Sequence, residues 1–171
     1  MRVMTVARDM DLPDWMIFSG AIYQPVWNHL TGRPVEHGLN DYDLAYFDAT
    51  DLSYEAEDAV IRRVATALEA PLKTMVEVRN QARVHLWFED HFGEAYGPLT
   101  NSAEALTRFT ATAFAVGARL EADGALSITA PFGLEDLFAL RLRANPLRPS
   151  AAFARTAKAA RRRWPEITVE D

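Results

Sequence analysis

The chain has 171 residues, of which 49% are hydrophobic and 25% are charged, and it contains no cysteine. This length fits one domain, residues 1–171, with the composition of an ordinary globular protein. The missing cysteines exclude disulfide bonds, thiolate nucleophiles and cysteine-ligated zinc, and the net charge of −6 disfavours non-specific binding of long nucleic acid.

The N-terminal segment, MRVMTVARDMDLPDW, has no sustained apolar run and carries Arg and Asp early, which is unlike a signal peptide. No stretch of the chain approaches the roughly 20 apolar residues that a membrane span needs. We therefore expect a cytoplasmic protein without a membrane partner.

The first third of the chain predicts a helix, a strand and a second helix. Residues 1–10 fit the end of a helix, which stops at the Asp-Leu-Pro-Asp step of 11–14. The apolar run Trp15–Phe18 ends in Ser19-Gly20 and predicts a buried strand closed by a turn. Residues 21–30 then have apolar side chains at helical spacing, and 32–38 predict a loop.

Two further strands are expected around a long helix. Tyr42–Phe47 interleaves apolar and polar residues, and Thr74–Arg79 alternates with period two. Between them, Ser53 is a plausible N-cap for a helix from 54 to about 70, which Pro71 ends. These patterns predict the α/β (α+β) class: a small mixed sheet flanked by helices, with these two strands and Trp15–Phe18 as neighbours.

The second half of the chain is expected to be mostly helical around one C-terminal hairpin. Residues 80–92 fit a continued strand or a helix, and a helix from Arg83 is favoured. Asp123-Gly124 is a strong hairpin signal. The other expected elements are a helix from Ser102 through Ala113, hairpin strands within 114–121 and 125–129, a short helix after the turn at 131, a helix over 151–164, and a loose end.

The segment Asn40-Asp-Tyr-Asp-Leu44 is the most informative about chemistry. On a strand, Asp41 and Asp43 would project from the same face, where two carboxylates repel each other unless they share a proton or a cation. Mg²⁺ (or Mn²⁺) suits such a pair, because it takes one or two carboxylates and fills its other positions with water and phosphate oxygens. The competing interpretation is a solvated turn at the start of a strand.

Two other features strengthen the metal interpretation. A helix that starts at Ser19-Gly20 presents free N–H groups that favour phosphate. Glu77 lies in the middle of a strand between two valines, where it is either a third carboxylate of the site or a partner of Arg79.

Four segments together resemble the polymerase-beta-like nucleotidyltransferase superfamily, and within it a small bacterial nucleotidyltransferase-like family. They are Trp15–Gly20, NDYDLAYFD at 40–48, EVRNQARVHLW at 77–87 and APFGLEDL at 130–137. The resemblance implies metal-dependent transfer of a nucleoside monophosphate from an NTP to an acceptor that the sequence does not identify.

The resemblance also implies roles for single residues. Ser19 and Gly20 would contact the phosphates, Asp41 and Asp43 would hold the metal, and Glu77 would be the third carboxylate and accept a proton. The alternative function, which the Ser-Gly order at 19–20 leaves open, is a catalytically silent relative that binds a nucleotide or a protein partner.

Several other polar and aromatic residues have two interpretations. Arg83 would face the nucleotide if the strand continued past Glu77, or else would pair with an acidic neighbour. His85 is expected to be a half-buried structural residue, and the basic run at 158–163 a solvated helix end. Trp27, Trp87 and Phe88 are predicted to belong to the core.

Overall fold

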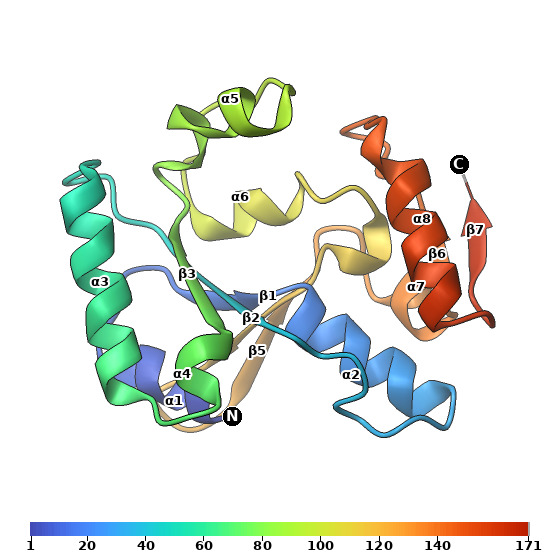
Figure 1. Cartoon of the computed structure of the whole chain (residues 1–171), viewed down its shortest axis with the longest axis horizontal. Helices are drawn as coiled ribbons and strands as arrows, with labels where there is room; N and C mark the ends of the chain where they lie inside the picture. The colour runs from blue at the N-terminus through green and yellow to red at the C-terminus, as the bar shows by residue number, and fades with distance from the viewer. Residues whose placement is uncertain (171) are drawn as a thin grey trace.

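A five-stranded sheet in the order β3-β2-β1-β4-β5 forms the centre of the structure (Figure 1). The computed structural model describes residues 1–170. The strands are β1 (Met16–Phe18), β2 (Tyr42–Tyr46), β3 (Val76–Asn80), β4 (Gly117–Leu120) and β5 (Leu126–Thr129). β2 and β3 are parallel and the other neighbours antiparallel, so the three strands expected from the sequence are neighbours in one mixed sheet and the hairpin at Asp123-Gly124 is confirmed.

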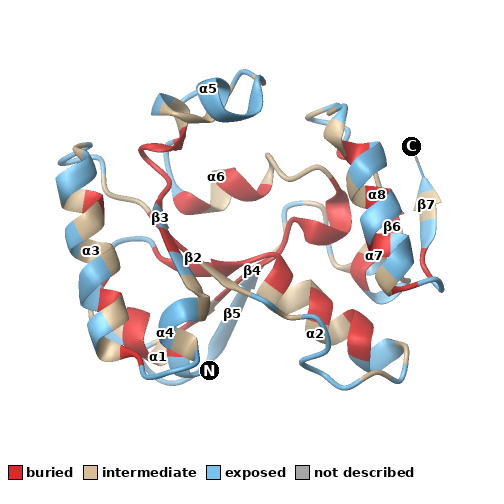
Figure 2. Cartoon of the chain, viewed as in Figure 1, coloured by how far each residue is buried: buried red, intermediate tan, exposed pale blue. Residues whose placement is uncertain are grey.

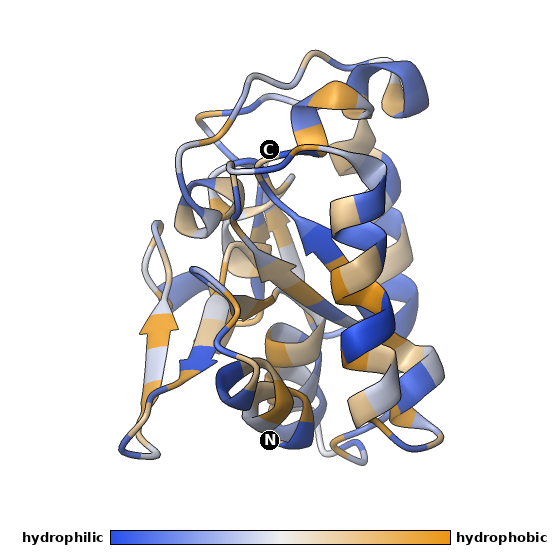
Figure 3. Cartoon of the chain, turned by 90° about the vertical axis from the view of Figure 1, so that its left-hand side faces the viewer, coloured by the Kyte–Doolittle hydropathy of each residue, from blue (hydrophilic) through white to orange (hydrophobic). Residues whose placement is uncertain are grey.

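One face of the sheet is covered by helices from the first half of the chain. These are α1 (Arg2–Asp9), α3 (Tyr54–Ala67) and the single turn α4 (Leu72–Met75). Leu44, Tyr46 and Val78 point into the core on this side, which Figure 2 shows as buried segments of β2 and β3. Seen from the α3 side, hydrophilic and hydrophobic residues alternate along this helix (Figure 3), as expected for a helix with one face on the core.

The start of α3 agrees with the sequence, whereas its end does not. The Ser53 hydroxyl accepts a hydrogen bond from the Ala56 amide at 3.2 Å, as predicted for an N-cap. The helix ends at Ala67, three residues before the expected position. No helix among residues 1–170 is long and apolar enough to cross a membrane.

A second core lies beside the sheet and joins α2 (Gly20–Leu30) to the C-terminal third of the chain. It contains the fully buried indoles of Trp27 and Trp164. The elements around it are η2 (Thr112–Phe114), α7 (Glu135–Phe138), β6 (Arg141–Arg143), α8 (Ala152–Arg163) and β7 (Thr168–Glu170). The expectation of a loose C-terminal end is wrong, because β7 pairs in parallel with β6 and Ile167 is buried in this core.

The region between β3 and β4 is made of short helices that lie above the other face of the sheet. They are η1 (Val84–Leu86), α5 (Phe88–Phe92) and α6 (Ser102–Leu106). Residues 83–92 are thus mainly helical, as the sequence favoured, but they form two short helices instead of one. Asn101, not Ser102, caps α6 by accepting from the Glu104 amide. The helix stops at Leu106 instead of Ala113, because Asn145 donates to the carbonyls of Thr107 and Phe109 at 2.7 Å and holds them out of a helix.

Arg83 connects this region to α3 through a buried ion pair. Its Nη1 donates to Oε2 of Glu57, and its Nε donates to the Leu52 carbonyl at 2.7 Å. The other oxygen of Glu57 accepts from the Asn80 amide at 2.8 Å, at the end of β3. The side chains of Arg83 and Glu57 are only 11% and 6% exposed, so the structure uses this arginine as a cross-link between α3 and β3.

Arg83→Met should therefore lower the free energy of unfolding by about 3–5 kcal/mol, because it leaves the Glu57 carboxylate buried without a counter-charge. Adding Glu57→Gln should restore part of this loss, since it removes the charge and keeps an acceptor for Asn80. Arg62→Met is the matched control, because Arg62 pairs with Asp58 on the same helix but is 79% exposed. Urea unfolding would measure all three, and a loss below about 1 kcal/mol for Arg83→Met would contradict a structural role.

Candidate active site

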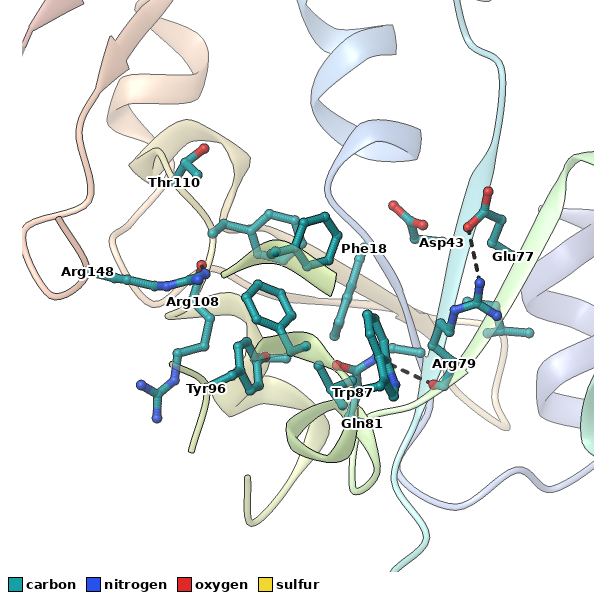
Figure 4. A pocket seen from close by; sticks show the side chains of 17 residues that line it. Phe18, Asp43, Glu77, Arg79, Gln81, Trp87, Tyr96, Arg108, Thr110 and Arg148 are labelled. Atoms are coloured by element: carbon teal, nitrogen blue, oxygen red, sulfur yellow. Dashed lines mark hydrogen bonds and ion pairs between the residues drawn. The ribbon is translucent and has the colours of Figure 1, made fainter. Parts of the chain in front are cut away.

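The register of the sheet aligns Asp43 with one residue from each neighbouring strand. Asp43 pairs with Phe18 on β1 and with Glu77 on β3. Leu44 and Val78 point into the core below the sheet, so the side chains of Asp43 and Glu77 lie on the opposite face. Both carboxylates line the same pocket, in which Figure 4 shows them side by side.

The carboxylate of Asp43 lies in an environment that disfavours its charge. Burial, followed by the negative charges of Asp41 and Glu77, raises the pKa of Asp43 to about 6, against the lowering effect of Arg79. Asp41 lies immediately before β2, two residues from Asp43. Three acidic groups thus act on one another with only partial compensation from a cation of the chain itself.

The arginine beside Glu77 is a weak partner. Nη2 of Arg79 lies 3.9 Å from Oε2 of Glu77, and the two side chains are 47% and 56% exposed. An exposed pair at this distance contributes little to stability. Arg79 is therefore present at the site without neutralising it.

The junction of β1 and α2 lies next to Asp43, because Phe18 ends β1 and α2 begins at Gly20. Ser19 between them has φ of 47°, a left-handed conformation that is costly for a residue with a side chain. Its amide donates to the Val116 carbonyl at 2.8 Å, which holds the turn in place. A Cβ on Gly20 would lie 2.9 Å from Nε2 of Gln24, so this position has no room for a side chain without movement of Gln24.

The loop between α2 and Asp41 is held by a buried asparagine. The side-chain amide of Asn28 donates to the carbonyls of Val35 and His37 at 2.9 Å, and its oxygen accepts from the Trp164 indole at 2.9 Å. The C-terminal helix thereby helps to position the residues that lead into Asp41. No pattern in the sequence indicated this role for Asn28.

Tyr23 and Arg163 are two further residues near the carboxylates that the sequence did not point to. Burial, with a smaller contribution from Asp41 and Asp43, raises the pKa of Tyr23 to about 12, against the lowering effect of Arg163 and of a hydrogen bond with Gln24. Nη1 of Arg163 donates to Oε1 of Gln24 at 2.7 Å, so this arginine is not a solvated helix end as predicted for the basic run. Tyr23 therefore keeps its proton at neutral pH, on the α2 side of the acidic group.

The pocket above Asp43 has a volume of about 410 Å³ and a largely aromatic wall. Trp27 is a core residue as predicted, but Trp87 and Phe88 are not: they line this pocket together with Phe92 and Tyr96. Their apolar pattern indicated burial, yet the segment lies over the sheet and turns these rings towards the carboxylates. Arg108 and Arg148 come from later parts of the chain to line the same pocket.

The structure brings some of the predicted site residues together and separates others. Asp43 and Glu77 line the pocket, whereas Ser19, Gly20, Asp41 and Arg83 do not. Arg83 is held by Glu57 away from it, and Arg79 lines the pocket instead.

The acidic residues do not form a ready-made metal cage. Among residues 1–170, no group of three or more His, Asp or Glu residues is arranged so that it could hold a metal ion. Two adjacent carboxylates nevertheless fit Mg²⁺, which takes one or two of them and completes its shell with water and phosphate oxygens. Burial and the repulsion from Asp41 and Glu77 raise the pKa of Asp43, and a bound cation would relieve this repulsion.

Comparison with known proteins identifies the family. No curated protein sequence matches the chain. An NMR structure described as revealing a CCA-adding enzyme head domain has the same fold: its TM-score is 0.78, at 21% identity, over 99% of this chain and 87% of that one. A family model described as Nucleotidyltransferase matches residues 5–169, and the chain therefore belongs to this nucleotidyltransferase family.

Proposed function

We propose that the protein transfers a nucleoside monophosphate from an NTP to an acceptor, with Asp41 and Asp43 as the ligands of Mg²⁺ or Mn²⁺. The observation that carries this proposal is the row of Phe18, Asp43 and Glu77 across three strands, with the start of α2 at one end. Membership of a nucleotidyltransferase family supports the reaction class.

Each residue of this arrangement has a distinct task in the proposal. The start of α2 at Gly20 binds the phosphates, because its first N–H groups have no partner within the helix and the helix dipole favours an anion there. The cation, when bound, neutralises charge on the phosphoryl oxygens. Glu77 accepts the proton of the attacking hydroxyl, a role that its exposure to the pocket allows.

Nucleotide binding is the first expectation. Each of the four NTPs with Mg²⁺ or Mn²⁺ should be tested for a shift in melting temperature, since a ligand at 100 times its Kd adds about 2.7 kcal/mol of stability. Asp43→Asn should abolish the shift. Asp123→Asn should not, because Asp123 lies in the hairpin turn, where asparagine can also accept from the Ala125 amide. If no NTP shifts the wild-type protein with either cation, the proposal fails; binding without transfer would favour a silent relative.

The acidic cluster should also reduce stability when no divalent cation is present. The pKa of Asp43 rises from 3.8 to about 6 on folding, so the ionised form costs stability above pH 6, and this cost disappears as the pH falls below 3.8. Asp43→Asn should therefore raise the free energy of unfolding by about 1–2 kcal/mol at pH 8, a value reduced from the full shift because the group is partly exposed. Urea unfolding in EDTA should show that the gain in the free energy of unfolding from Asp43→Asn decreases between pH 8 and pH 4. A gain that is the same at both pH values would contradict its origin in the ionised Asp43 carboxylate.

Glu77→Gln distinguishes a proton acceptor from a structural partner of Arg79. If Glu77 accepts the proton, the transfer rate should fall by about 10²–10⁴-fold with nucleotide binding kept and the melting temperature unchanged or slightly higher. Glu121→Gln is the control, since Glu121 forms a comparable exposed pair with Arg119 at 3.6 Å outside the site. A destabilised but fully active Glu77→Gln protein would remove Glu77 from the mechanism.

A further inference from the structure

The pocket lies over the face of the sheet that carries Asp43. Phe18, Glu77 and Arg79 line it, whereas Ser19 and Gly20 do not. In Figure 4, Asp43 and Glu77 lie at one end, Tyr96, Arg108 and Arg148 at the other, and Trp87 between them. The cavity therefore leads from the carboxylates towards η1 and α5 and does not include the first residues of α2.

This asymmetry has a consequence for the reaction. Phosphoryl transfer places the attacking and leaving oxygens roughly in line, on opposite sides of the phosphorus. If the leaving pyrophosphate lies at the start of α2, as in the proposed function on which this inference rests, the attacking hydroxyl arrives from the other side. That side is the pocket, and Glu77 is at its entrance.

The walls of the pocket suit a flat apolar group. The ring of Phe88 lies 4.6 Å from that of Phe92 and 4.5 Å from that of Tyr96, centroid to centroid. Phe18 and Phe109 contact each other at 5.9 Å and line the cavity as well. Such rings bind planar groups by stacking, and aromatic side chains that remain exposed around a cavity are typical of a ligand site.

Arg148 holds this wall in position. Its guanidinium lies 5.1 Å from the centre of the Phe88 ring and 5.6 Å from that of Tyr96, and it pairs with Glu94 at 2.7 Å. It also donates to the Arg108 carbonyl. Through these contacts Arg148 orders the wall.

Arg108 differs from Arg148 in the weakness of its acidic partner. Its Nη2 lies 3.4 Å from Oε1 of Glu104, against 2.7 Å for the pair of Arg148 and Glu94, and its side chain is 36% exposed. A negatively charged group of a ligand at this end of the pocket would therefore meet an accessible guanidinium that is only weakly neutralised.

We propose that this pocket is the acceptor site, and that the acceptor is a small molecule with a planar aromatic body and an anionic group directed at Arg108. Its hydroxyl oxygen attacks the α-phosphorus of the NTP, forming the new O–P bond as the bond to pyrophosphate breaks, and the hydroxyl proton passes to Glu77. A cavity of about 410 Å³ is in the range of small-ligand sites and is formed by this chain alone.

The dye 8-anilinonaphthalene-1-sulfonate, a planar aromatic anion, is a suitable probe for the full-length chain. The fluorescence of the dye itself rises in an apolar site, so it measures binding to the wild-type protein and to variants without Trp87 alike. We expect one dye per chain, weakened about tenfold by Trp87→Leu and by Arg108→Met. Phe138→Leu is the control, because Phe138 is exposed on α7 outside the pocket.

Competition with nucleotide separates the possible outcomes. An acceptor site predicts that Mg·ATP and the dye bind together, and that Trp87→Leu leaves the affinity for Mg·ATP unchanged. If Mg·ATP displaces the dye and Trp87→Leu weakens ATP but not inorganic tripolyphosphate, the pocket binds the donor base and the inference is overturned. Dye binding that is insensitive to Trp87→Leu overturns it too.

The proposed function itself fails on a different result: none of the four NTPs and no tripolyphosphate binds with Mg²⁺ or Mn²⁺, whatever the dye does. If Trp87→Leu does not fold, Phe92→Ala replaces it, because Phe92 lines the same pocket and is 55% exposed. Loss of dye binding in this folded variant supports the acceptor site, and unchanged binding contradicts it.

Discussion

The pairing of β2 with both β1 and β3 is the constraint on which the rest of the site depends. It places Asp43 between Phe18 and Glu77, and strand periodicity then directs the two carboxylates to the same face. A shift of β3 by one residue would turn Glu77 into the core and Val78 into the pocket. The same pairing brings the start of α2 beside Asp43, because α2 follows directly after the end of β1.

This arrangement stores electrostatic repulsion that the scaffold has to tolerate. Acidic groups crowd one another on a partly buried surface, as the raised pKa of Asp43 reflects. Around them, buried polar groups are well bonded: Glu57 with Arg83 fixes the end of β3, and Asn28 with Trp164 fixes the approach to Asp41. Such satisfied networks make a unique conformation stable, and they allow the site itself to remain electrostatically unfavourable.

The pocket combines two chemistries because its walls come from different parts of the chain. The strands supply carboxylates, and the segment from η1 to Tyr96 supplies aromatic rings. Arg148, far along the chain, stacks on those rings and ties them to the turn after α6. The acidic end and the aromatic end thus belong to one cavity, although no short stretch of sequence contains both.

Local patterns in the sequence determined the five strands of the central sheet, the Ser53 cap and the hairpin, because period-two alternation and turn chemistry depend on residues close in the chain. The pair of β6 and β7, which joins segments far apart in the chain, was not predicted. The shared face of Asp43 and Glu77 also follows from strand periodicity once β2 and β3 are neighbours. Only the tertiary structure decided whether Arg83 faces a ligand, since its partner Glu57 lies 26 residues earlier on another element. The same holds for Trp87: its apolar character predicts burial, but whether it packs in a core or lines a cavity depends on which surface its segment crosses. Periodicity describes the face that a side chain takes, whereas the partner on that face is set by contacts between distant segments.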